Sequence, residues 1–149
     1  MTPTSEQARP AAEVAAAERL YQAVSRLVRW SRRAVVAPVG PGTMSALATV
    51  VDVGPIRLGD LAAREGVTPA TLSRIVAGLE EGGLISRSVD PADRRSSFAE
   101  ATEDGRRLVD QVRRMRASAL LERFDRLEPE ARAKLVEALE AFEALVEDV

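Results

Sequence analysis

Apolar side chains recur at every third or fourth position over most of this chain, which is the spacing of amphipathic helices. The first such stripe starts at Ala11 and continues for about twenty residues, until the prolines and glycines at 38–42 interrupt it. Further helical stripes follow at 43–53, at 58–65, at 69–81, from Thr102 toward Phe124, and from Glu128 through Val146. The pattern therefore predicts a mainly α-helical protein.

One part of the chain departs from the helical spacing. Residues 84–89 (LISRSV) alternate apolar and polar side chains as a strand does, and a second short strand is expected at 96–101. The turn-forming residues DPADRR at 90–95 separate the two, so this segment predicts a β-hairpin. Ile56 and Arg57 are expected to form a brief extended link between two helices. The predicted order is four helices, a hairpin and two helices.

The helices at 58–65 and 69–81 are joined so closely that they must cross steeply, as in a helix–turn–helix. The second helix turns its apolar positions inward, at Leu72, Ile75, Val76 and Leu79. Its exposed first turns carry mostly short side chains and one arginine: Thr68, Ala70, Thr71, Ser73 and Arg74. Short side chains let a helix lie close to base edges, and Arg74 can reach guanine. The alternative is an ordinary helical hairpin with a solvated face.

The tip of the predicted β-hairpin carries Asp93, Arg94 and Arg95. Two adjacent arginines on a protruding turn can enter a minor groove or hold backbone phosphate, and Asp93 can fix one guanidinium by a paired hydrogen bond. The alternative is a solvated turn whose ion pair contributes little. A helix–turn–helix followed directly by an arginine-tipped hairpin is the pattern of a winged helix–turn–helix, which predicts a DNA-binding lobe.

Residues 54–108 contain the motifs LAAREGVTPATLSR, DPADRR and TEDGRRL, and with them the chain resembles the MarR family of bacterial transcriptional regulators. The resemblance implies a homodimer whose first and last helices interlock, binding double-stranded DNA at a pseudo-palindromic operator. Many members release DNA when they bind a small aromatic or lipophilic effector. Position by position, the resemblance places Thr68, Ala70, Thr71, Ser73 and Arg74 in the major groove and assigns Asp93, Arg94 and Arg95 to the wing.

The terminal helices favour a dimer independently of the resemblance. A winged lobe of about 65 residues is too small to bury the apolar stripes of the first and last helices as well. We therefore expect three parts, namely a disordered lead at 1–10, a winged helix–turn–helix lobe at 39–104, and a helical dimerisation region formed by 11–38 and 105–149. The alternative is a monomer whose terminal helices fold back onto their own lobe.

Composition narrows the chemistry further. The chain contains neither cysteine nor histidine, which excludes disulfides, thiol nucleophiles and imidazole ligands or bases. We expect no cofactor, no metal site and no enzymatic activity. The net charge of −2 combines an acidic segment after residue 116 with a near-neutral body, so it does not exclude a nucleic-acid face. No apolar run approaches the ~20 residues of a membrane span, so we expect a cytoplasmic protein without membrane contacts.

These observations lead to one preferred function and two alternatives. The preferred function is a dimeric, sequence-specific DNA-binding repressor that a small molecule releases by a non-covalent route. We place the effector near Tyr21, Arg29, Trp30 and Met44, although plain packing would also account for these residues. One alternative is a winged-helix module that contacts only proteins. The other is an enzyme that uses neighbouring carboxylates, such as Asp90 and Asp93 or Glu80 and Glu81.

Overall fold

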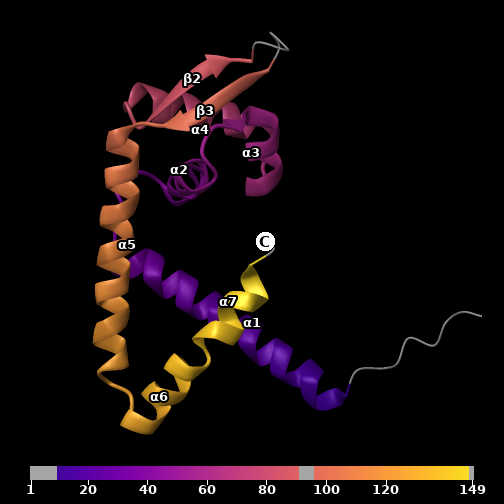
Figure 1. Cartoon of the computed structure of the whole chain (residues 1–149), viewed down its shortest axis with the longest axis vertical. Coiled ribbons are helices and arrows are strands. Elements are labelled where there is room, and N and C mark those ends of the chain that lie inside the picture. The colour runs from indigo at the N-terminus through magenta and orange to yellow at the C-terminus, as the bar shows by residue number, and fades with distance from the viewer. Residues whose placement is uncertain (1–9, 91–95, 148–149) are drawn as a thin grey trace, which may run out of the picture. The chain divides into compact units, whose positions relative to one another are not determined.

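A computed structural model describes residues 10–90 and 96–147 of the chain (Figure 1). Its elements are α1 (Ala11–Ala34), α2 (Pro41–Val53), β1 (Ile56–Arg57), α3 (Leu58–Glu65), α4 (Pro69–Glu81), β2 (Ile85–Val89), β3 (Ser97–Ala101), α5 (Glu103–Phe124), α6 (Pro129–Glu137) and α7 (Leu139–Val146). Most of the chain is helical and one small antiparallel sheet is present, which confirms the predicted fold class. The chain divides between Val36 and Ala37 into two compact units, with α1 in the first and all later elements in the second.

The sheet has three strands in the order β1-β3-β2, and both pairings are antiparallel. The β2–β3 hairpin was expected, with Ile85 opposite Ala101 and Val89 opposite Ser97. The link at Ile56–Arg57 is more than an extended connection, because it pairs with β3 as an edge strand. Two residues are too few to show alternation, which is why the sequence pattern did not reveal this strand.

Leucines and valines from four helices form the core of the second unit. Among the described residues, the largest fully buried side chains are Leu47, Leu61, Leu72, Leu79, Val50, Val76 and Val109. Three of them come from α4 at the spacing expected for its inward face, while Ile75 is only half-buried. Each such side chain contributes about 1.5–3 kcal/mol when it leaves water, so this core holds α4 firmly against α2 and α3.

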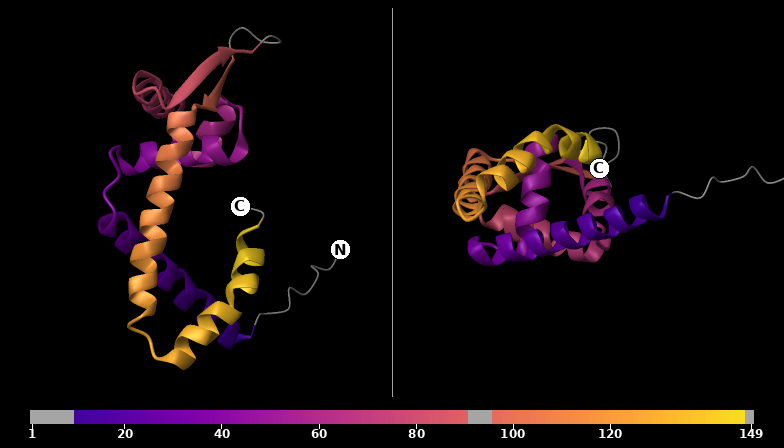
Figure 2. Two further views of the ribbon diagram at one scale, coloured as in Figure 1. Left: turned by 60° about the vertical axis from the view of Figure 1, so that its left-hand side comes forward. Right: turned by 90° about the horizontal axis from the view of Figure 1, so that it is seen from below.

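The start of α5 is joined tightly to the end of α4 and the start of β2. Thr102 caps α5 by accepting a hydrogen bond from the Gly105 amide at 3.1 Å, and its hydroxyl donates to the Gly83 carbonyl at 2.7 Å. The Thr102 amide donates to the Leu84 carbonyl at 3.1 Å. Gly83 has a φ of 68°, a conformation that favours glycine. These bonds place the hairpin and the first turn of α5 at the same end of the unit (Figure 2).

The last helical segment was predicted as one helix, and in this detail the prediction was wrong. The structure has two helices, α6 and α7, which meet at Ala138. The interruption is slight, because Ala138 keeps helical angles and the amides of Ala138 and Phe142 still donate to carbonyls four residues earlier. The apolar spacing therefore continues across the break and gave no sign of it.

Helices α1, α6 and α7 contain no buried residue in the part of the chain that the structure describes. Their apolar side chains are instead largely exposed, among them Val14, Leu20, Leu27, Val28, Leu135, Val136, Leu139, Leu145 and Val146. Of the described helices, none is long and apolar enough to cross a membrane. The exposed stripes are apolar faces that the described chain does not cover.

Candidate nucleic-acid interface

Helices α3 and α4 form the predicted helix–turn–helix. Helix α3 ends at Gly66, whose φ of 62° is the left-handed conformation of a helix C-terminus, and the Val67 amide donates back to the Ala62 carbonyl at 3.1 Å. Helix α4 begins one residue after Thr68, whose side chain accepts from the Thr71 amide at 3.2 Å. A glycine stop and a threonine cap thus complete the turn within three residues.

The residues predicted to read DNA lie together on the first two turns of α4. Thr68, Ala70, Ser73 and Arg74 are exposed, whereas Thr71 is half-buried and its hydroxyl accepts from that of Thr68 at 3.0 Å. Sequence reasoning did not include Ala77, which is exposed one turn beyond Ser73 and Arg74. Ala77 lies four residues after Ser73 and three after Arg74, and this helical spacing would have placed it on the same face. The result is a narrow face of short side chains around one arginine.

Arg74 is free to meet an acceptor, whereas several other arginines of the same unit are paired with acidic side chains. Arg57, Arg87 and Arg106 pair with the acidic side chains of Asp90, Glu80 and Glu100 respectively. Within the described ranges, Arg74 has no hydrogen bond or ion pair. An arginine with an unengaged guanidinium at the start of a helix suits two acceptors of guanine or a phosphate.

The wing residues Asp93, Arg94 and Arg95 lie outside the described residues, so their role stays a prediction. The structure does describe the strands that carry them. Directly after β2, Asp90 is buried and its carboxylate lies 2.7 Å from the Arg57 guanidinium. The sequence placed Asp90 in the turn of the wing and Arg57 in an extended link, and it did not predict that the two residues pair. The one available signal was a carboxylate immediately before the proline of the turn.

The residues predicted to bind an effector belong to both units of the chain. Tyr21, Arg29 and Trp30 lie on α1, where Tyr21 is 74% exposed and Trp30 is half-buried. Met44 lies on α2 and is buried in the core of the second unit. The grouping of these four side chains around one ligand therefore stays a prediction.

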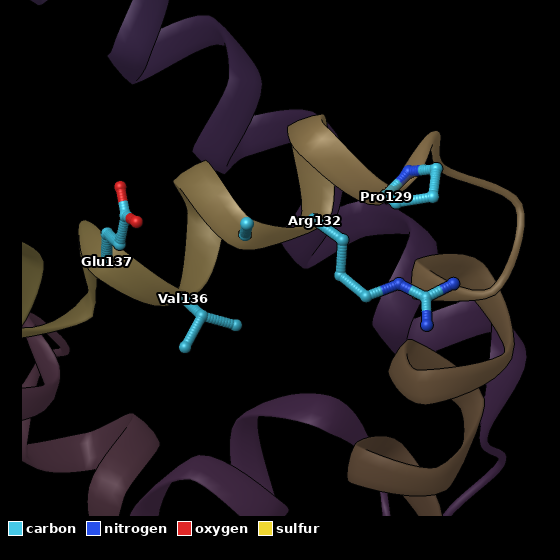
Figure 3. Close-up of a pocket in the computed structure, with 5 residues that line it drawn as sticks. Pro129, Arg132, Val136 and Glu137 are labelled. Carbon is cyan, nitrogen blue, oxygen red and sulfur yellow. The ribbon is translucent and has the colours of Figure 1, made fainter.

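Two shallow hollows each follow a single helix. One of about 410 Å³ runs along α6 and is lined by Pro129, Arg132, Ala133, Val136 and Glu137 (Figure 3). The other, of about 500 Å³, runs along α1 between Ala16 and Arg26. None of the predicted effector residues lines either hollow. Among residues 10–90 and 96–147, no group of three acidic side chains is placed to hold a metal ion.

Comparisons with known proteins agree with this geometry. The family model described as "MarR family" matches residues 41–97. An uncharacterized HTH-type transcriptional regulator of Mycobacterium bovis is 36% identical over 130 residues, which cover 87% of this chain and 91% of the relative. The crystal structure of RV1404 from Mycobacterium tuberculosis is 30% identical, with a TM-score of 0.76 over 95% of this chain and 98% of that one.

A third comparison includes a ligand. BpsR of Bordetella bronchiseptica, whose solved structure concerns the regulation of its DNA binding by 6-hydroxynicotinic acid, is 25% identical with a TM-score of 0.60. The match covers 86% of this chain and 98% of that one. Together with the winged lobe and the helix–turn–helix, these likenesses establish that the chain belongs to the MarR family of DNA-binding transcriptional regulators.

Proposed function

We propose that the protein is a homodimeric repressor that reads a pseudo-palindromic operator through helix α4 of each subunit. The observation that carries this proposal is the first part of α4, where Arg74 stands unengaged among short side chains. A helix with this face can approach base edges closely, and the arginine supplies directional donors for guanine. The wing residues Asp93, Arg94 and Arg95 are proposed to add minor-groove or phosphate contacts.

The dimer is supported by the apolar faces of the terminal helices. Helices α6 and α7 expose Leu135, Leu139 and Phe142 at helical spacing, and α1 exposes a second stripe. Apolar faces of this length are unusual on a monomer and are typical of subunit interfaces. We propose that residues 11–38 and 105–149 form the dimerisation region and that 39–104 form the DNA-binding lobe, with the protein acting in the cytoplasm and without catalysis.

A small-molecule effector is proposed to release the DNA. The support is the family, in which the DNA binding of BpsR is regulated by 6-hydroxynicotinic acid. Because this chain has no cysteine or histidine, it cannot sense through thiol oxidation or a histidine-ligated metal, and non-covalent binding of a small molecule remains. The family likeness suggests that this molecule is aromatic or lipophilic. Tyr21, Arg29, Trp30 and Met44 are the residues proposed to contact it.

The experiment compares two single substitutions that each remove one positive charge. A duplex is first enriched by the wild-type protein from a random-sequence library, and its affinity is then measured by fluorescence anisotropy. Arg74→Ala is expected to weaken binding by roughly fivefold to 150-fold and to relax the preference at one base pair. Lys134→Ala on α6, which breaks an exposed pair with Glu130, is the matched control. It should change neither the affinity for the duplex nor the base preference.

Two results would contradict the proposal. If Arg74→Ala binds the enriched duplex as the wild type does, with the same base preference, α4 does not read the sequence. If no duplex is enriched at all, the lobe does not bind DNA under these conditions, and the alternative of a winged-helix module for protein contacts is favoured.

A further inference from the structure

Asp90 is the only charged side chain that is buried among the residues that the structure describes. It follows β2 directly, and its amide donates to the Ser96 carbonyl at 3.0 Å across the hairpin. Its side chain is 4% exposed, and its carboxylate forms an ion pair with the Arg57 guanidinium at a distance of 2.7 Å. A carboxylate removed from water in this way requires a partner, because an unpaired buried charge costs several kcal/mol.

The partner, Arg57, connects the hairpin to the helix–turn–helix. It lies on β1, opposite Phe98 of β3, and is the residue directly before α3. Its guanidinium lies over the Phe98 ring at 5.4 Å from the ring centre. Since β3 lies between β1 and β2, the side chain of Arg57 crosses the middle strand to reach the residue at the end of β2.

The backbone alone holds β1 weakly to the hairpin. Only two residues of β1 pair with β3, against five residue pairs between β2 and β3. The ion pair and the ring contact therefore act as a brace between the far end of the hairpin and the first residue of α3. A planar guanidinium can lie over a ring and pair with a carboxylate at the same time, which a lysine ammonium does less well.

We propose that Arg57 and Asp90 are positioning residues for DNA binding, which brace the β2–β3 hairpin at a set angle to α3 and α4. The inference rests on the proposed reading of DNA by α4. Helix α4 and the two strands of the hairpin lie at the same end of the second unit (Figure 1), so the angle of the hairpin would determine where it meets a duplex bound to α4. Neither side chain needs to touch DNA, because Arg57 is neutralised by Asp90 and Asp90 repels phosphate.

Asp90→Asn distinguishes positioning from simple charge. The change removes one negative charge from the DNA-binding lobe, so a charge effect alone would strengthen binding. Loss of the brace changes the DNA affinity in the opposite direction, and we expect binding of the enriched duplex to weaken by roughly tenfold. Glu103→Gln is the matched control, since it also removes one negative charge from an arginine pair, but from an exposed one within α5, and it should bind equally or more tightly.

Arg57→Lys provides the second variant. It keeps the positive charge but loses the stacked, planar donor, so we expect it to weaken binding as Asp90→Asn does. In both variants the base preference should match the wild type, because α4 is intact. The slope of log affinity against log salt should fall by about 0.9 for each phosphate contact that the displaced hairpin loses.

Thermal unfolding of each variant without DNA separates positioning from loss of fold. If Asp90→Asn does not fold, the DNA affinity and the salt slope of Arg57→Lys test the proposal instead. Wild-type affinity and salt slope in a folded Asp90→Asn or Arg57→Lys protein would overturn the proposal, and so would tighter binding by Asp90→Asn. Faster amide exchange of Ser97–Ala99 in the free variants is expected as well. A wild-type protein that binds no duplex overturns the proposed function itself, which is a distinct result.

Discussion

Replacing Gly105 with alanine tests whether α5 is fixed to the DNA-binding lobe at its first turn. An added Cβ would overlap the Leu84 carbonyl oxygen, and it would lie 3.1 Å from the Leu84 carbonyl carbon and 3.2 Å from Leu47 Cδ1. The first two of these atoms belong to the backbone of the segment that enters β2, so they cannot rotate away. Either α5 or this segment has to move.

Two effects of opposite sign determine the size of the loss. In an open helix, alanine stabilises relative to glycine by about 1 kcal/mol. Overpacking of a filled site costs about 1–3 kcal/mol, and backbone overlap belongs at the upper end. Moving α5 also strains the bond from the Gly105 amide to the Thr102 hydroxyl, which contributes about 1 kcal/mol. The net expectation for Gly105→Ala is a loss of about 3 kcal/mol of unfolding free energy.

Thermal and urea unfolding at one fixed protein concentration measure this loss. A loss of this size corresponds to a fall of roughly 6–12 °C in Tm for a chain of this length. Gly78→Ala is the matched control, because Gly78 lies within α4 with nothing inside 4 Å of its added Cβ. This control should gain about 1 kcal/mol. Equal stability of Gly105→Ala and the wild type would refute the reasoning.

Three further expectations concern the cap, the interface and a surface ion pair. Thr68→Ala removes the cap of α4 and should lower the unfolding free energy, measured in urea, by about 1 kcal/mol. An unchanged unfolding free energy would contradict the role of the cap. Phe142→Asp should shift the protein toward monomers in light scattering after gel filtration, while Glu147→Gln should not; unchanged mass in both would contradict the interface. A double-mutant cycle on Arg113 and Asp52, which are half-exposed and 2.6 Å apart, should give a coupling below about 1 kcal/mol.

Local signals allowed the helix–turn–helix to be predicted from sequence. Gly66, Thr68 and Pro69 specify a stop, a cap and a start within four residues, and the apolar spacing of α4 identifies its buried face. Each of these signals acts between near neighbours in the chain, which is why the pattern alone suffices. Once the buried face was identified, the remaining positions of α4 could be predicted to be exposed.

Features that depend on distant contacts were not accessible in the same way. Asp90 is buried because Arg57, far earlier in the chain, reaches it across β3, and nothing in the local sequence DPADRR records that contact. The strand at Ile56–Arg57 exists only through its pairing with β3. Met44 was expected near the effector, whereas in the structure its side chain is buried in the core of the second unit.

The junction of α4, β2 and α5 would constrain how a signal from the proposed dimerisation region reaches the DNA. Thr102 bonds to Gly83, Leu84 and Gly105, and the close approach of Gly105 leaves no room for α5 to pivot there. A change in the direction of α5 must therefore carry the whole winged lobe with it as one body. An effector that shifts α5 in a dimer would change the spacing of the two α4 helices without altering the face that reads the bases. In the proposed dimer, release of DNA would then follow from a mismatch with the ~34 Å repeat of the major groove.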